Sequence, residues 1–357
     1  MADLPGSDIE RMAKLRLIRS ENVGPVSYRH LTARYGSASA ALEALPDLAR
    51  RGGGRDFRIA NLAAVQREME AVDAAGARLV FLGEANYPPL LAEIEDAPPA
   101  LAVRGEIKHV GARNASAAAI RFARGLAADL AATDIVVVSG LARGIDAAAH
   151  AGALSGGTIG VIAGGIDNIY PPENAELYAA LYERGLVIAE QPFGTEPQAR
   201  HFPRRNRLIS GLSAGIVVVE AAPRSGSLIT ARFAGEQGRE VMAVPGFPLD
   251  PRAQGCNQLI RDGATLVQSA ADIAETIAPF GAARLAAGGS RFAAPPPTDA
   301  DDSARDAVTA LLSLTPVAVD ELVRLSGEPP AVVQTVLLEL ELAGRLARHA
   351  GARVALA

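Results

Sequence analysis

Short apolar runs alternate with helical segments over residues 135 to 267 of this 357-residue chain. The runs are rich in β-branched residues, as in Ile216-Val217-Val218-Val219, and are short enough to be strands buried on both faces. Several end in turns of small residues, such as Ser225-Gly226-Ser227. This alternation predicts an α/β fold with a doubly wound, mainly parallel sheet, whose ligands bind where the strands' carboxyl ends meet.

Different patterns flank this region. Residues 1–75 predict a helical domain, in which the turn at 22–25 resembles a helix-hairpin-helix unit. Such a hairpin either packs or holds a DNA phosphate, and we favour packing because few basic residues lie nearby. Residues 76–280 form the expected sheet domain, and the Ala-, Gly- and Pro-rich segment 281–303 a linker. Residues 304–357 predict three helices and a hairpin, which make a winged helix.

The winged helix carries a charge pattern that disfavours binding of its recognition helix in a DNA groove. Its candidate recognition helix, 329–343, contains Glu339 and Glu341 and neither Lys nor Arg. An acidic helix enters a major groove poorly, because the groove is lined by phosphates. Packing or protein contact is therefore at least as well supported as DNA binding for this domain.

Composition limits the partners. The formal net charge of −5 means that nucleic acid could be held only by a local basic patch. A single cysteine, Cys256, excludes an internal disulfide framework and a cysteine-rich zinc site. We expect a cytoplasmic protein without a membrane partner, because no signal peptide and no uncharged apolar run of membrane-spanning length is present.

An arginine cluster supplies such a patch. Arg200, Arg204, Arg205 and Arg207 follow one another with no acidic residue between Glu196 and Glu220. They lie at an expected helix start, where backbone N–H groups and the helix dipole already attract anions. Phe202 stands beside them and could stack on a base. We therefore favour binding of a phosphate backbone over a merely solvated helix face.

The usual catalytic and cofactor signatures are missing. The sequence has no phosphate loop with a Walker lysine, no Gly-x-Ser-x-Gly elbow and no His-Glu-x-x-His helix. Gly140 and Gly144 are spaced Gly-x-x-x-Gly, which is not the dinucleotide fingerprint. Asp146 and His150 could pair on one helix, but no third ligand or nucleophile accompanies them. We expect no cofactor, no metal and no catalysis.

Several motifs together resemble the DprA/Smf family, the DNA-processing proteins of bacterial natural transformation. The similar stretches are GARNAS at 111–116, SGLARGIDAAAH at 139–150, IAGGIDNIYPPEN at 162–174, HFPRRNRLISGLS at 201–213, VVEAAPRSGSLITA at 218–231 and GREVMAVPGFPLDPRAQGCNQLIRDGA at 238–264. The resemblance implies an extended Rossmann domain that binds and protects single-stranded DNA, forms a homodimer and loads the RecA recombinase. It also implies a sterile-alpha-motif-like domain over 1–75 and a winged helix over 304–357.

The resemblance also points to DNA-binding residues. They lie on the Gly-x-Arg-x-x-Ser turn, the next strand-to-helix turn, the arginine cluster and the small-residue turn after it. The residues are Arg113, Ser116, Ser139, Gly140, Gly144, Phe202, Arg204, Arg205, Asn206, Arg207, Gly226 and Ser227.

One segment departs from the family pattern. Family members have a longer segment, ending in a Val-Ala-Ile-Val-like strand, before the Gly-x-Arg turn, and this chain is shorter there by about one strand. Either the sheet is reduced or residues are missing before Gly111. We favour missing residues, because losing a strand would expose its neighbours. This shortening weakens the placement of Arg113 most.

Two other functions fit parts of the pattern. A phosphoribohydrolase-like enzyme shares the small-residue turn followed by Thr, but places a catalytic Glu after it. Here Thr230 is followed by Ala231, Arg232, Phe233 and Ala234. A transcription regulator acting through the winged helix is the third possibility, against which the acidic recognition helix argues.

Overall fold

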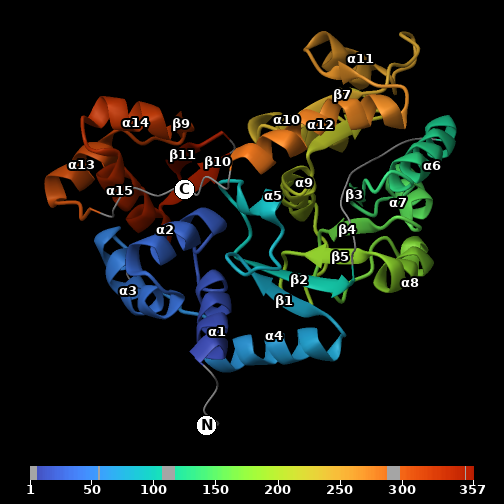
Figure 1. Ribbon diagram of the computed structural model, residues 1–357. Helices are drawn as coiled ribbons and strands as arrows, with labels where there is room; N and C mark the ends of the chain where they lie inside the picture. The colour runs from blue at the N-terminus through green and yellow to red at the C-terminus, as the bar shows by residue number, and fades with distance from the viewer. Residues whose placement is uncertain (1–5, 55–56, 107–116, 288–297, 350) are drawn as a thin grey trace. The chain divides into compact units, whose positions relative to one another are not determined.

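The structure is a computed structural model that describes residues 6–54, 57–106, 117–287, 298–349 and 351–357 (Figure 1). The chain divides into two compact units. The first combines residues 1–67 with 291–357, and the second spans 68–290. Each is described by itself below.

The amino-terminal part of the first unit is helical, as expected. Its helices are α1 (Gly6–Ile18), α2 (Pro25–Tyr35) and α3 (Ala38–Arg51), and α4 (Leu62–Ala74) begins in this unit and ends in the second. Pro25 begins α2, where its missing N–H would have no partner anyway, and Gly36 ends this helix with a φ of 76°. The helices enclose a core that includes Leu17, Tyr28 and Leu45.

The carboxyl-terminal part of this unit is a winged helix, which confirms that prediction. Its elements are α13 (Asp302–Ala310), β9 (Val317–Ala318), α14 (Val319–Ser326), α15 (Pro330–Leu342), β10 (Leu346–His349) and β11 (Arg353–Leu356). The antiparallel strands have the order β10-β11-β9. Glu339 of α15 is 1% exposed, and its carboxylate accepts hydrogen bonds from Arg305 at 2.7 and 3.1 Å.

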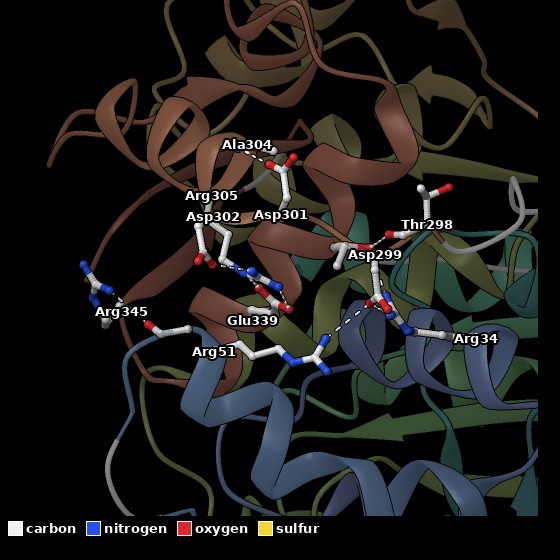
Figure 2. A network of polar contacts seen from close by, with 12 residues as sticks. Arg34, Arg51, Thr298, Asp299, Asp301, Asp302, Ala304, Arg305, Glu339 and Arg345 are labelled. Atoms are coloured by element: carbon white, nitrogen blue, oxygen red, sulfur yellow. Dashed lines mark hydrogen bonds and ion pairs between the residues drawn. The ribbon is translucent and has the colours of Figure 1, made fainter.

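Helix α15 packs on α3, so the two parts of the first unit share a core. Leu338 and Leu342 of α15 join the cluster formed by the amino-terminal helices. Polar contacts follow the same seam (Figure 2). Arg34 pairs with Asp299 and donates to the Thr335 hydroxyl at 3.1 Å, while Arg345 donates to the Gly52 carbonyl at 2.9 Å. The candidate recognition helix therefore serves as a packing surface.

Gly52 provides a test of this packing. Its φ of −73° suits any residue, but a Cβ there would overlap the carbonyl oxygen of Glu339 and lie 3.0 Å from the Cβ of Ala343. We expect Gly52→Ala to lower the free energy of unfolding of the first unit by about 1–3 kcal/mol, measured by urea denaturation. Gly125→Ala is the control, because that position has open space around its Cβ and the change should be neutral or stabilising. Unchanged stability for Gly52→Ala would contradict the packing of α15 on α3.

The second unit begins with a mixed five-stranded sheet. Its strands are β1 (Arg78–Phe81), β2 (Ala100–Gly105), β3 (Val137–Ser139), β4 (Thr158–Ile162) and β5 (Leu186–Ala189). They have the order β1-β2-β5-β4-β3. Strands β3, β4 and β5 are parallel to one another, β2 pairs antiparallel with β5, and β1 pairs antiparallel with β2. The associated helices are α5 (Pro89–Ala92), α6 (Ala117–Ala131), α7 (Ile145–Ala153) and α8 (Ala175–Arg184), with a short 3-10 turn at Pro172–Asn174.

A separate parallel sheet completes this unit. Its strands are β6 (Gly215–Val218), β7 (Glu240–Ala243) and β8 (Thr265–Leu266), in the order β6-β7-β8. Its helices are α9 (His201–Gly211), α10 (Gly226–Glu236), α11 (Gln254–Arg261) and α12 (Ala270–Ala287). The predicted α/β class is thus confirmed, while the expected doubly wound sheet consists of two parts.

The two sheets are separated between β3 and β6, each of which is an edge strand of its own sheet. We expected a shortened sheet to expose the strands beside the gap. Instead Val137 is 0% exposed and Val217 is 2% exposed. Helix α6 contributes to clusters with both residues, which explains why they stay buried.

Among the described residues, no helix combines the length and apolarity needed to cross a membrane.

Candidate nucleic-acid interface

The predicted site lies at the carboxyl ends of β3, β4 and β6, where α9 approaches the following turns. Two cavities open there, of about 230 and 260 Å³. Phe202 and Arg205 of α9 and Ala142 of the turn after β3 line both. The structure thus brings two of the predicted turns and the arginine-rich helix together.

Arg205 joins these elements. The residue is 8% exposed, and its guanidinium donates to the carbonyl of Gly140 and, at 2.7 Å, to that of Val161. A Cβ at Gly140 would overlap this guanidinium, so the glycine is required for the approach. Burial lowers the pKa of Arg205, and the nearby carboxylate of Asp146 opposes that shift. Arg205 therefore positions the turns after β3 and β4 and offers little surface to a ligand.

Arg207 requires a correction to the predicted cluster. Its side chain is 8% exposed and pairs with Glu190 and, at 3.2 Å, with Asp96. It also donates to the Asp96 carbonyl at 2.7 Å. Burial alone would lower the pKa of Arg207, but the two carboxylates hold it above its ordinary value. Its charge is neutralised inside the unit by Glu190 and Asp96, which lie on other segments of the chain, although Arg204 is only one helical turn away.

Arg204 is the exposed arginine of the predicted cluster in α9. No ion pair or hydrogen bond of its guanidinium is seen within the described part of the chain. The neighbouring loop adds Arg224, which is also exposed and has a φ of 74°. Helices α9 and α10 pack together, and the Asn206 amide donates to the Gly226 carbonyl at 3.3 Å. Arg204 and Arg224 are thus two exposed cations on adjoining elements that form no ion pair with the residues described.

Phe202 lies beside Tyr170, with ring centroids 5.8 Å apart and planes inclined at 57°. Tyr170 is 48% exposed, Phe202 is half-buried, and both line the smaller cavity. Such a pair of rings offers aromatic faces on which bases can stack.

The remaining predicted residues lie in the turns and helix starts of the site, and most of them contribute backbone groups to it. Ser139 is 3% exposed, and the N–H of Gly140 donates to the Asp146 carboxylate at 2.8 Å. Gly144 is exposed and precedes α7 with a φ of 81°. Gly226 is exposed at the start of α10, and the Ser227 hydroxyl lies 2.8 Å from that of Ser225. Arg113 and Ser116 lie outside the described residues.

His150, which could have paired with Asp146, takes part in a buried hydrogen-bond chain instead. Its Nδ1 lies 2.7 Å from the hydroxyl of Thr158, which donates to the Val137 carbonyl at 2.6 Å. Because Thr158 gives its proton to Val137, Nδ1 of His150 must be the protonated ring nitrogen. Burial lowers the pKa of His150 to about 4. The histidine thus has a structural role, and no group of three or more potential metal ligands occurs among the residues described.

This shift predicts an acid-sensitive fold. The folded-state pKa lies below the ordinary 6.5, so the stabilisation is complete above pH 6.5 and is lost as pH falls toward 4. At pH 5, His150 alone should lower the free energy of unfolding by about 2 kcal/mol relative to neutral pH. Urea denaturation at pH 7.5 and 5 should show a smaller loss for His150→Gln than for the wild type. Equal losses would show that His150 is accessible to protons in the folded state.

Sequence reasoning missed Tyr170, Arg143 and Arg224. Each lies in a turn that follows a strand, which is the signal that could have identified them. Arg143 is exposed and pairs with Glu173 at 2.7 Å, so its charge is partly offset.

Comparisons with known proteins cover nearly the whole chain. Residues 78–278 match the family described as DNA recombination-mediator protein A. Residues 8–71 match the DprA-like N-terminal HHH domain, and residues 292–352 match the DprA winged helix domain.

Individual relatives agree with these matches. Protein Smf of Escherichia coli is 43% identical over 286 residues, which are 76% of this chain and 75% of the relative. DNA processing protein DprA of Bacillus subtilis is 42% identical over 222 residues, or 59% of this chain and 75% of the relative.

Two solved structures are similar to the chain. DNA processing protein A from Streptococcus pneumoniae has a TM-score of 0.60 and 33% identity, covering 76% of this chain and 97% of that one. A structure of DNA processing protein A from Helicobacter pylori, which concerns that protein's single-stranded DNA binding mode, has a TM-score of 0.50 and 26% identity. It covers 57% of this chain and 96% of the other. The resemblance inferred from the motifs is confirmed, and the chain belongs to the DprA/Smf family of DNA processing proteins.

Proposed function

We propose that this chain binds single-stranded DNA across the carboxyl edge of its second unit. The observation that carries the proposal is the placement of Arg204 and Arg224, exposed and without ion pairs among the described residues, on elements adjoining the Phe202–Tyr170 ring pair. Cations attract the phosphate backbone, and aromatic faces accept any base. Together they provide binding with little sequence preference.

The arrangement favours a single strand over a duplex. The half-buried Phe202 borders cavities of about 230 and 260 Å³ that a base can enter only when it is unstacked. Duplex bases are stacked and present only their edges in the grooves. The winged helix offers no obvious alternative, because α15 has Leu338 and Leu342 in the core shared with the amino-terminal helices. The Helicobacter pylori relative's single-stranded DNA binding is consistent with this choice.

Salt dependence tests the electrostatic part of the proposal. We expect binding of a fluorescein-labelled oligothymidylate, followed by fluorescence anisotropy, to weaken as salt rises, with a log–log slope of about −0.7 for each neutralised phosphate. Arg204→Ala should make the slope shallower by about 0.7. Arg232→Ala should leave it unchanged, because Arg232 pairs with Glu236. Affinity independent of salt would contradict the proposed contact, as would stronger binding of the corresponding duplex.

We further propose that the bound strand is protected and passed to the RecA recombinase by a homodimer, as family membership implies. Sequence-neutral binding suits this role because the recombinase must act on any sequence. The protein should accelerate the onset of DNA-dependent ATP hydrolysis by RecA on single strands, and Arg204→Ala should reduce that acceleration. Sedimentation should give twice the monomer mass. A monomer, or an unchanged lag in ATP hydrolysis, would contradict the respective proposal.

We also propose that the chain acts without catalysis and without a cofactor, in the cytoplasm. The sequence after Thr230 supports the absence of catalysis, because no acid follows at the position where the related hydrolases place one. Purified protein should release no free base from nucleoside monophosphates. Base release above that of a protein-free blank would revive the hydrolase alternative.

A further inference from the structure

One arginine beside the proposed path of the DNA strand already has an anionic partner within the chain. Arg143 lies in the turn after β3, and its guanidinium is 2.7 Å from the carboxylate of Glu173 in the 3-10 turn after β4. Both side chains remain open to solvent, at 71% and 58% exposed. An ion pair this exposed is weak because water competes for both charges, so either group can exchange its partner.

The backbone around this pair is held by contacts that do not depend on its charges. The Asn174 amide donates to the Leu141 carbonyl at 2.8 Å, which ties the 3-10 turn to the turn after β3. Leu141 has a φ of 56° and a fully buried side chain, so packing fixes the turn in an unusual conformation. Glu173 is therefore kept opposite Arg143 by the fold, and neutralising either charge should leave both turns in place.

The pair adjoins the aromatic faces on which bases would stack. Arg143 lines the cavity of about 230 Å³ together with Tyr170 and Phe202. Arg205 lines it as well, but its guanidinium is buried and bonded to two backbone carbonyls. A strand stacked on the rings would therefore bring a phosphate to Arg143, whose partner can be exchanged.

We propose that Glu173 is an internal competitor of the DNA phosphate for Arg143. In the free protein the carboxylate occupies the guanidinium. In the complex a phosphate oxygen takes its place, and Glu173 turns to solvent. Because the strand must displace the carboxylate to make this contact, the competition lowers affinity and keeps the strand exchangeable. The inference deepens the proposed DNA binding and rests on it.

The exchange is favourable once a strand is bound. A phosphodiester carries a full negative charge and accepts paired hydrogen bonds from a guanidinium, as a carboxylate does. Its neutralisation also releases counterions condensed on the DNA, a gain that the internal ion pair does not provide. Glu173 returns to water at little cost because its side chain is already 58% exposed. Arg143 is therefore a phosphate contact in the complex although it is paired in the free protein.

A double-mutant cycle tests the competition on the full-length protein, with labelled oligothymidylate and fluorescence anisotropy. Glu173→Gln should tighten binding about two- to fivefold, because the amide no longer competes for the guanidinium. The same change made together with Arg143→Gln should have no effect. Glu176→Gln is the matched control, since Glu176 is exposed, lies three positions later and pairs with no cation among the described residues. It alters the net charge equally and should leave affinity nearly unchanged.

The salt dependence of binding separates this exchange from a merely structural role. Arg143→Gln should make the log–log slope shallower by about 0.7, because one phosphate contact is lost. Glu173→Gln should keep the slope of the wild type, because its complex contains the same contacts. Both variants should melt as the wild type does, since the two side chains are exposed.

Four results would overturn the proposal. These are no gain for Glu173→Gln, a gain that persists without Arg143, an equal gain for Glu176→Gln, and a slope that Arg143→Gln leaves unchanged. With a wild type that binds the oligonucleotide, each of them overturns this inference alone. A wild type that binds no oligonucleotide would overturn the proposed DNA binding as well.

Discussion

Arg207→Met is expected to destabilise the second unit by about 3 kcal/mol, although the residue belongs to the basic stretch that looks suited to DNA. The substitution leaves the carboxylate of Glu190, whose side chain is 18% exposed, without its buried cation. Breaking a buried pair in this way costs several kcal/mol because one charge stays desolvated. Asp96 loses its ion pair as well, but it is 42% exposed and can recruit water.

Matched variants separate this effect from DNA binding. Arg204→Met removes the same type of side chain three positions earlier and should change the free energy of unfolding by less than about 0.5 kcal/mol, because Arg204 is exposed. Adding Glu190→Gln to Arg207→Met should recover part of the lost stability, which a double-mutant cycle in urea would measure. Equal effects of Arg204→Met and Arg207→Met would contradict the burial of Arg207.

Phe202→Ala is expected to weaken binding of oligothymidylate by about 1–3 kcal/mol, or roughly five- to 150-fold in Kd. The ring offers a stacking face beside Tyr170, and alanine removes it while leaving Arg204 in place. Because the loss is in stacking and not in charge, the slope of affinity against salt should stay as in the wild type. Anisotropy titrations at several salt concentrations give both quantities.

A second phenylalanine serves as the control. Phe247 is 69% exposed in the loop after β7 and lines neither cavity near α9. Phe247→Ala should bind DNA as the wild type does, and a thermal melt should show both variants folded. Unchanged affinity of a folded Phe202→Ala protein would mean that bases do not stack at this position.

The sequence predicted the strands well because their signal is local. The β-branched run at 216–219 places β6 (Gly215–Val218) within one residue of its observed bounds. The signals for helix starts are also local. Pro25 begins α2 through its own fixed backbone geometry, and the Ser225 side chain caps α10 by accepting a hydrogen bond from the Ser227 amide.

The division of the arginine cluster was not predictable from the sequence. Arg204, Arg205 and Arg207 look alike in one basic stretch, yet their surroundings come from residues distant along the chain. Asp96 and Glu190 bury Arg207, and the carbonyls of Gly140 and Val161 hold Arg205. Only the tertiary structure brings these partners to α9.

The sequence allowed packing of α15 as an alternative to DNA binding, because Glu339 and Glu341 are acidic. It could not show which surface the helix packs on. The structure supplies the reasons for these acids: Glu339 pairs with Arg305 and Glu341 with Arg348 at 2.8 Å. Burial raises the pKa of Glu341, and Arg348 opposes that shift. Acidic residues in a recognition-like helix can thus be internal ion-pair partners.

Photocrosslinking tests the central claim most directly, since it reports where the strand lies. An oligothymidylate in which 5-iodouracil replaces single thymines should be crosslinked to the full-length protein and the joined peptides identified by mass spectrometry. The account predicts crosslinks at Phe202 or Tyr170, beside the exposed Arg204. Crosslinks confined to the winged helix at 304–357 would contradict it.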